Sequence, residues 1–193
     1  MVEAIHFLGM PIDSDEDYSL TVVHSAGSVL LGEKTRGFGN GKFVLPGGKD
    51  QYYLSQQGVH VVGPVDCAVR EAAQETGVSV SREAVRQVGF LRLTDEQSEN
   101  TQVRIFMSTV AHQVGLHDTG ELKNLHWRSE PDIPYGEMPY DYRLWLPRVL
   151  AGCVVNLFLD TDGGKVIGGK GYCQELEPLG RMKAFSVPAE SKH

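Results

Sequence analysis

The sequence predicts an α+β fold, in which helices flank a mixed β-sheet. Residues 64–76 have the apolar spacing and the end signals of a helix, and a second helical pattern covers residues 138–150. Several segments around them alternate apolar and polar residues, as strands do. The 193 residues, of which 41% are hydrophobic and 22% charged, show no repeat or linker. We therefore expect one globular domain over residues 1–193.

The strands of the predicted sheet are short and lie on both sides of the first helix. We expect them at residues 4–10, 20–31 with a break at 25–28, 42–45, 87–93, 102–110 and 125–128. The turn Thr161-Asp162-Gly163-Gly164 is typical of a hairpin, which we place at residues 154–167. The last twenty residues lack periodicity and predict an irregular tail. Pro147 is expected to kink or break the second helix.

The helix at residues 64–76 has clear signals at both ends. Pro64 suits its first position, Asp66 favours the positive end of the helix dipole, and Gly77 stands where a C-terminal cap belongs. Helical spacing places small and apolar residues on one face. The other face carries Cys67, Arg70, Glu71, Gln74 and Glu75. One face should therefore pack against the protein, and the other should face solvent or a ligand.

Two carboxylates stand one helical turn apart on that polar face. Like charges at this spacing repel by roughly a few tenths of a kcal/mol, so Glu71 and Glu75 suggest a bound cation. Oxygen ligands in a partial set suit Mg²⁺ or Mn²⁺, which take the rest of their shell from water and substrate phosphates. The alternative is a solvated face with an Asp66–Arg70 ion pair.

The segment before this helix makes the pattern specific. A short strand ends in the turn PGGK (46–49), and the helix carries REAAQETGV (70–78). Together, over about residues 48–78, they resemble the box of the Nudix hydrolases, G-x5-E-x7-R-E-U-x-E-E-x-G-U, where U is aliphatic. The matching residues are Gly48, Arg70, Glu71, Glu75, Gly77 and Val78. The resemblance implies the Nudix fold, an α/β/α sandwich with a mixed sheet, and a metal-dependent hydrolase of a nucleoside diphosphate linked to another moiety.

The resemblance extends over about residues 27–169 and points to one branch of the family. The segments that carry it are LLGEKTRGFGNGKF, ELKNLHW and DIPYGEMPYDYRLWLP. They resemble the MutT-like branch that includes the oxidised-purine (8-oxo-dGTP) nucleoside triphosphate diphosphatases. This implies a nucleoside triphosphate, oxidised forms included, as the substrate, with monophosphate and pyrophosphate as the products.

The same match implies roles for individual residues. Glu75 is expected to be the strongest metal ligand, and weaker candidates are Glu71, Gln74 and the carbonyl of Gly48. Glu121 would be a further ligand or the catalytic base, and Arg70 would hold the helix and the loop in register by pairing with a carboxylate. The substrate-binding candidates are Lys34, Phe38, Val44, Lys49, Asp141 and Tyr142. Lys34, Arg36 and Lys49 could meet the phosphates.

Four departures from the family pattern bear on function. Gln74 replaces the first of the paired box glutamates. Between Gly48 and Arg70 lie 21 residues where the family has 13, and none of them is a glutamate. We expect the extra residues, within 50–62, to form a longer loop. Val44 replaces the purine-reading asparagine, and Tyr142 replaces the second of two neighbouring aspartates.

Two alternatives stay open at this point. One is another Nudix substrate, such as ADP-ribose or a dinucleoside polyphosphate, which Val44 and the longer loop would accommodate. The other is a catalytically degenerate module that binds a nucleotide without cleaving it, which Gln74 and the missing glutamate favour. Retention of Glu71, Glu75 and Glu121 opposes the second alternative.

Composition restricts the partners and the compartment. The net charge of −7 argues against a nucleic-acid-binding surface, so the expected partner is a small nucleotide. Three cysteines without metal-ligand spacing suggest free thiols and a cytoplasmic protein. No apolar run long enough to span a membrane is present. We expect a monomer or a homodimer.

Overall fold

The computed structural model describes residues 16–50, 52–55, 58–61, 63–95, 100–111, 115–175 and 182–191; at residues 16, 52–55 and 58–61 it describes the backbone alone. The strand expected at residues 4–10 lies outside these ranges. The strands are β1 (Glu16–Ser25), β2 (Ser28–Lys34), β3 (Phe43–Val44), β4 (Gly47–Lys49), β5 (Tyr52–Ser55), β6 (Gly58–Val61), β7 (Arg86–Asp95), β8 (Thr101–Thr109), β9 (Leu122–Ser129), β10 (Cys153–Asp162), β11 (Lys165–Glu175) and β12 (Lys183–Val187). The helices are α1 (Pro64–Thr76) and α2 (Tyr142–Leu150), with 3₁₀ turns at Arg82–Ala84, Glu130–Asp132 and Tyr135–Glu137.

Ten strands form one mixed sheet, as the sequence predicts. Its order is β12-β11-β10-β7-β8-β1-β2-β3, with β4 paired to β1 and β9 paired to β2. The pairs β1–β8 and β7–β10 are parallel, and the other pairs of this sheet are antiparallel. One edge of β1 is shared, because β4 pairs with its first half and β2 with its last residues. This sharing brings residues 46–49, which we call the β4 turn or glycine turn, into the middle of the sheet.

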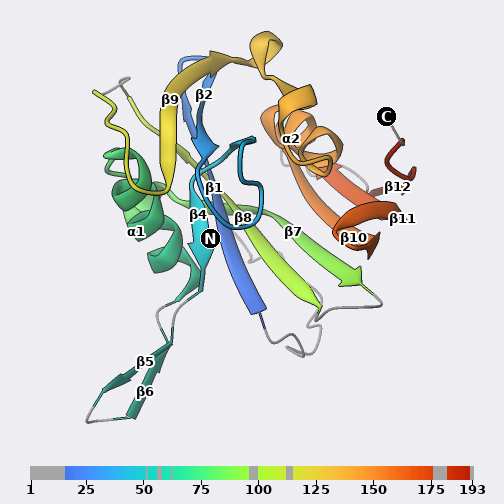
Figure 1. Cartoon of the computed structure of the whole chain (residues 1–193), viewed down its shortest axis with the longest axis horizontal. Coiled ribbons are helices and arrows are strands. Elements are labelled where there is room, and N and C mark those ends of the chain that lie inside the picture. The colour runs from blue at the N-terminus through green and yellow to red at the C-terminus, as the bar shows by residue number, and fades with distance from the viewer. Residues whose placement is uncertain are drawn as a thin grey trace.

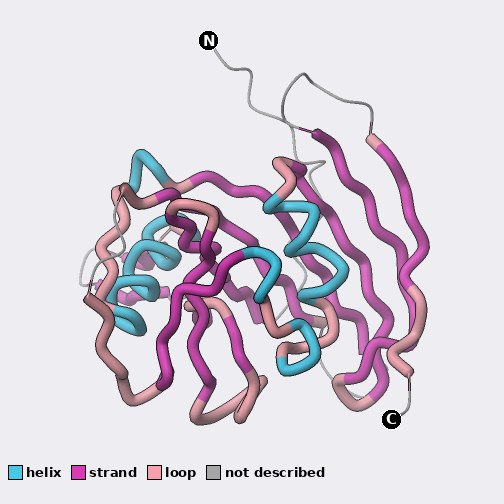
Figure 2. Tube along the Cα trace, turned by 90° about the horizontal axis from the view of Figure 1, so that it is seen from above, coloured by secondary structure: helices cyan, strands magenta, loops and turns pink. Residues whose placement is uncertain are grey.

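The two helices cover different parts of the sheet. Helix α1 packs on β1 and β4, whereas α2 packs on β10. Figure 1 shows α1 to one side of the central strands and α2 to the other. Seen from above in Figure 2, the helices are well separated, and the strands before the C-terminus form one edge of the sheet. The two-helix arrangement confirms the predicted α+β fold.

Helix α1 has the predicted bounds, but its buried face differs from the prediction. Pro64 is its first residue, and Gly77 ends it in the left-handed conformation with φ of 76°. Its expected polar face is partly buried, because Cys67, Glu71 and Glu75 all have less than 9% of their surface exposed. The reason is the β4 turn, which lies against this face. The polar face therefore meets protein rather than open solvent.

Two other segments correct the expectations from sequence. Residues 50–62 were expected to form a loop, yet they contain β5 and β6, which pair with each other in a separate two-stranded sheet. Figure 1 shows this hairpin extending away from the main sheet. The tail was expected to be irregular, but β12 pairs with β11 over residues 183–187. Hydrogen bonding to an available strand edge orders this segment despite its lack of periodicity.

The C-terminal hairpin and the second helix follow the predictions in part. Strands β10 and β11 form the expected hairpin, but β11 continues well past residue 167. Helix α2 begins at Tyr142 rather than near residue 138, and it continues through Pro147 to Leu150. Trp145, on this helix, is fully buried. The helix is therefore held by its packing, despite the proline.

Candidate active site

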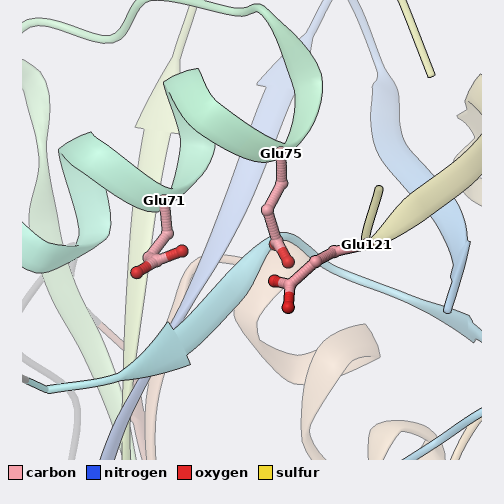
Figure 3. A group of neighbouring side chains, drawn as sticks. All are labelled: Glu71, Glu75 and Glu121. Atoms are coloured by element: carbon pink, nitrogen blue, oxygen red, sulfur yellow. The ribbon is translucent and has the colours of Figure 1, made fainter. Parts of the chain in front are cut away.

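Three glutamates from two separate segments converge beside the β4 turn. Glu71 and Glu75 come from successive turns of α1, and Glu121 immediately precedes β9. Figure 3 shows the carboxylates of Glu75 and Glu121 next to each other, with that of Glu71 to one side of them. One oxygen of each lies within 4.8 Å of an oxygen of the others. We call Glu71, Glu75 and Glu121 the carboxylate cluster.

Glu75 is the most deeply buried member of the cluster. It is 3% exposed, and its Oε2 accepts a hydrogen bond of 2.7 Å from the backbone N–H of Gly47. Its Oε1 lies 3.1 Å from Lys34 Nζ. Burial raises the pKa of Glu75 to about 7, although the charge of Lys34 and the hydrogen bond from Gly47 oppose the rise. The cluster can therefore hold or release a proton near neutral pH.

Glu121 is more exposed and carries the opposite shift. Arg36 binds it with both Nε and Nη2, at 2.9 and 2.6 Å from Oε1, and Lys34 Nζ lies 3.8 Å from Oε2. Hydrogen bonds with Glu75 and with Arg36 lower the pKa of Glu121. A proton on the Glu75–Glu121 pair therefore resides on Glu75, which donates to the Glu121 carboxylate.

Glu71 lies against the glycine turn. Arg70 Nη2 donates to Glu71 Oε1 over 2.6 Å. A Cβ built on Gly48 would lie 2.9 Å from the Glu71 carboxyl carbon, and one on Gly47 would lie 2.3 Å from the Ser19 carbonyl oxygen. Gly47 needs to be glycine, because a side chain there would push the turn off β1, and a side chain at Gly48 would displace the Glu71 carboxylate. The carboxylate that Arg70 contacts belongs to the next residue of the same helix, so this pair does not itself join the helix to the loop. Asp66 pairs with Arg82 at 2.6 Å.

The cluster has the donor chemistry of a divalent cation site. Three carboxylates at this separation offer hard oxygen ligands and a concentration of negative charge that cations would relieve. The cations of Lys34 and Arg36 supply part of that relief. Gln74, which the sequence suggested as a further ligand, is exposed on α1. The carboxylates that could hold a metal are Glu71, Glu75 and Glu121.

A pocket of about 600 Å³ lies at the other side of the loop that follows β2. Phe38 and Lys42 from this loop line it, together with Asp141 and Glu190, and we call it the Phe38 pocket. The loop is closed at its base, since Lys34 N donates to Lys42 O over 2.9 Å. One short loop therefore contacts the carboxylate cluster at one end and the Phe38 pocket at the other.

The remaining predicted substrate residues are placed differently. Asp141 lines the pocket and accepts a hydrogen bond of 3.0 Å from Trp145 Nε1, while burial raises its pKa. Tyr142 is 3% exposed, its ring packs on Trp145 at 5.0 Å, and its hydroxyl accepts from Leu45 N over 3.4 Å. Tyr142 is thus a core residue in this structure, with no face open to a base. Val44 is buried and Lys49 is exposed.

Comparison with known proteins identifies the fold and the family. A family model described as the NUDIX domain matches residues 18–149, which is more than half of the chain. The chain belongs to the Nudix family. Over 134 residues it is 32% identical to the oxidized purine nucleoside triphosphate hydrolase of Mus musculus, a match that covers 69% of this chain and 78% of the mouse protein.

Solved Nudix structures share the fold at lower identity. The MutT protein from Bacillus halodurans superposes with a TM-score of 0.57 at 21% identity, covering 75% of this chain and 90% of that one. The Nudix domain of Shewanella oneidensis NrtR, complexed with ADP ribose, gives 0.54 at 14% identity and covers 76% and 96%. These matches confirm the predicted Nudix fold.

The family and the mouse relative also decide between enzyme and binding module. This Nudix chain is a pyrophosphohydrolase that acts on nucleoside diphosphate-linked substrates. Nudix hydrolases generally require a divalent metal, which agrees with the donor set of the cluster. The three cysteines are free. Among the described residues, no helix is long and apolar enough to cross a membrane.

Sequence reasoning missed several contacts of the site. Arg36 was expected to meet phosphates, and the structure pairs it with Glu121. Glu190, in the segment expected to be an irregular tail, lines the Phe38 pocket. It lies outside the family match, so no motif could have indicated it. Asp50 and Arg104, which meet beside the glycine turn, are 54 residues apart and gave no local signal.

Proposed function

We propose that this Nudix enzyme hydrolyses a nucleoside triphosphate, oxidised forms included, to the monophosphate and pyrophosphate. The observation that supports this most directly is the position of the loop between Lys34 and Lys42. Lys34 and Arg36 contact the carboxylate cluster, and Phe38 and Lys42 line the Phe38 pocket. A base in the pocket would therefore extend its phosphates along this loop toward the cluster.

The proposed cofactor is Mg²⁺ or Mn²⁺, held by Glu71, Glu75 and Glu121. When bound, such a cation neutralises charge on the diphosphate oxygens and acidifies a coordinated water. Gly47 orients Glu75 through its N–H, and Arg70 orients Glu71. Because hydrogen bonds lower the pKa of Glu121, its ionised carboxylate is the candidate to accept the proton of the attacking water.

The basic residues of the loop would act on the substrate. Lys34 and Arg36 lie at the cluster, where a diphosphate would bring further negative charge. Charge-assisted hydrogen bonds to phosphate oxygens are about twice as strong as neutral ones, so both side chains can orient the linkage for attack. Phe38 is 74% exposed at the pocket and offers a flat apolar surface to a base.

Fewer residues bear on which base the enzyme prefers than on the hydrolysis of the diphosphate. The mouse relative is named for oxidised purine triphosphates, and the sequence resemblance to that branch implies Lys34, Phe38 and Asp141 as residues of the nucleotide site. Val44 has no hydrogen-bonding group, and Tyr142 is buried. Asp141 is then left without an aspartate at the next position of the chain. We therefore propose a weaker preference for one base than a site with both readers would have.

ADP-ribose is the second candidate substrate. The Shewanella domain, with the same fold, was solved with ADP ribose bound. Val44 is buried and has no hydrogen-bonding side chain to select a base, which favours a substrate recognised mainly through its diphosphate. The partner is in either case a small nucleotide rather than a nucleic acid polymer. We retain a cytoplasmic monomer or homodimer as a proposal.

A substrate panel tests this proposal. Purified protein is incubated with canonical and oxidised nucleoside triphosphates, ADP-ribose and dinucleoside polyphosphates, with Mg²⁺, Mn²⁺ or a chelator, and the products are resolved. We expect pyrophosphate and monophosphate from triphosphates, with no release in chelator. Cleavage of ADP-ribose alone would replace the first candidate by the second. Release that persists in chelator would contradict the metal assignment.

A further inference from the structure

A group of buried ionic side chains lies beside the glycine turn, outside the carboxylate cluster. Asp17 and Ser19 on β1, Asp50 after β4 and Arg104 on β8 form it, and we call it the Arg104 clamp. Arg104 Nη1 lies 2.9 Å from Asp50 Oδ2 and 3.3 Å from Asp17 Oδ2. Ser19 Oγ donates to Asp50 Oδ1 over 2.6 Å. The two aspartate side chains are each 6% exposed.

The clamp fixes the end of the strand that carries the glycine turn. Asp50 follows Gly48 by two residues, and its N–H donates to the Asp17 carbonyl over 2.8 Å. At the start of the turn, the Pro46 carbonyl accepts from Thr21 N over 2.9 Å. The segment between these anchors contains the Gly47 N–H that binds Glu75 and the Gly48 backbone that lies against Glu71.

The chain needs an anchor at this point because it leaves the sheet immediately afterwards. Strands β5 and β6 pair only with each other in their own sheet, and they lie between Asp50 and α1. An isolated two-stranded hairpin is marginally stable in water, so it cannot hold the glycine turn in place. The other carboxylate of this interval, Asp66, pairs with Arg82 near the surface.

Because the clamp is buried, its carboxylates depend on the positive charge of Arg104. A buried carboxylate is strongly unfavourable without its cation, so loss of Arg104 would drive Asp50 toward water. The Asp50 carboxylate would then either take up a proton or move toward water, and movement toward water would pull the end of β4 away from β1. That movement would carry Gly48 and Gly47 with it, and these glycines contact Glu71 and Glu75.

We propose that the Asp50–Arg104 pair is a positioning device for catalysis in this chain, which holds the glycine turn against the two glutamates of α1. The inference rests on the proposed metal-dependent function of the carboxylate cluster. It assigns positioning roles to Asp50 and Arg104, which touch neither substrate nor metal. The Asp50–Arg104 pair lies between the glycine turn and the inserted β5–β6 hairpin. It therefore keeps movement of the hairpin from displacing the turn.

Mn²⁺ binding, measured by the loss of the free-ion electron paramagnetic resonance signal, tests the inference without using activity. Three variants are compared with wild type: Asp50→Asn, Arg104→Met and Asp17→Asn. Residues that orient metal ligands typically change metal affinity by about 10- to 100-fold when replaced, so we expect Asp50→Asn and Arg104→Met to weaken Mn²⁺ binding by about ten-fold or more. Circular dichroism establishes that each variant is folded.

Asp17→Asn is the matched control. Asp17 has the same burial and the same partner as Asp50, but it stands on β1 and not on the chain that carries the turn. We expect the Mn²⁺ affinity of Asp17→Asn to stay within about two-fold of wild type. The substitution can lower the stability of the protein, but it does not displace Gly48. If Asp50→Asn binds Mn²⁺ like wild type, or Asp17→Asn weakens binding as much as Asp50→Asn, the positioning role is wrong.

Glu75→Gln separates this inference from the proposed function. If Glu75→Gln binds Mn²⁺ as wild type does, the cluster is not the metal site, and both the proposed function and the inference fail. If Glu75→Gln loses Mn²⁺ while Asp50→Asn keeps it, only the positioning role fails. If Arg104→Met does not fold, the comparison of Asp50→Asn with Asp17→Asn decides the question, because both substitutions are nearly isosteric.

Discussion

The carboxylate cluster and the Phe38 pocket lie at the two ends of one loop, but they are built in different ways. Each glutamate of the cluster has a defined partner: Gly47 and Lys34 for Glu75, Arg36 for Glu121 and Arg70 for Glu71. The pocket is open, and Phe38 at its rim is 74% exposed. The glutamates of the cluster are thus held by defined hydrogen bonds and ion pairs, whereas the pocket is an open surface.

The two regions also differ in how they relate to the family match. The cluster and its partners all fall within residues 18–149, whereas the pocket includes Thr161, Gly164, Val166 and Glu190 beyond it. The part of the site for which we propose hydrolysis therefore lies within the family match. The part that selects a base needs the structure of this chain, since strands β10 to β12 contribute to it.

Gly48→Ala should have the largest effect among the substitutions that leave the carboxylate cluster itself unchanged. The new methyl would lie 2.9 Å from the Glu71 carboxyl carbon, so turn and glutamate must separate. We expect kcat/KM to fall by about 10- to 100-fold, and overpacking to cost about 1–3 kcal/mol of stability. The control is Gly136→Ala, where a Cβ meets nothing within 4 Å. Steady-state kinetics with equal losses in both variants would show that the cluster does not depend on the turn.

Glu190→Gln should act on substrate binding and leave the chemical step unchanged. Glu190 lines the Phe38 pocket, and its charge helps to raise the pKa of Asp141. We expect KM to rise by up to about ten-fold, with different factors for different bases and with kcat unchanged. Exposed Glu137, replaced in the same way, is the control. A fall in kcat instead of a rise in KM would place Glu190 at the chemistry.

The free energy of unfolding of the metal-free protein should depend on pH, and this effect is smaller but has a defined direction. Because the pKa of Glu75 is about 7 when folded and 4.5 ordinarily, the folded state binds more protons between these values. The free energy of unfolding in chelator should therefore decrease as pH rises from about 5 to 7. The lowered pKa of Glu121 acts below this window. Denaturant titrations should show that Glu75→Gln removes the slope, and an unchanged slope would assign it to other groups.

Gln74→Ala should have the smallest effect. The sequence suggested Gln74 as a metal ligand, but its side chain is exposed on α1, next to the buried Glu75. An exposed substitution of this kind usually changes stability by less than about 0.5 kcal/mol, and we expect kcat/KM to stay within about two-fold. A loss of activity comparable to that of a cluster variant would restore Gln74 to the metal site.

The sequence predicts α1 well because its end signals are local. Pro64 and Gly77 fix the ends, and the i, i+4 spacing of Glu71 and Glu75 follows from helical geometry. What it did not predict is that the charged face is buried, since burial depends on the β4 turn, which reaches α1 only through the pairing of β4 with β1.

Contacts between distant residues could not be predicted for the same reason. Arg36 meets Glu121 across 85 positions, and Arg104 meets Asp50 across 54. Neither pair has a sequence pattern, because ion pairing between strands depends on the register of the sheet. Strand β12 was missed because its edge pairing with β11, rather than its own alternation, orders it.

The most direct test of the central claim is pyrophosphate release from a nucleoside triphosphate as a function of Mg²⁺ concentration, for wild type and Glu75→Gln. The substitution keeps the shape of the side chain and removes the charge that the cluster needs. We predict saturable, Mg²⁺-dependent release by wild type and a loss of at least about 100-fold in the variant. Equal release by both proteins would show that the carboxylate cluster is not the hydrolytic centre.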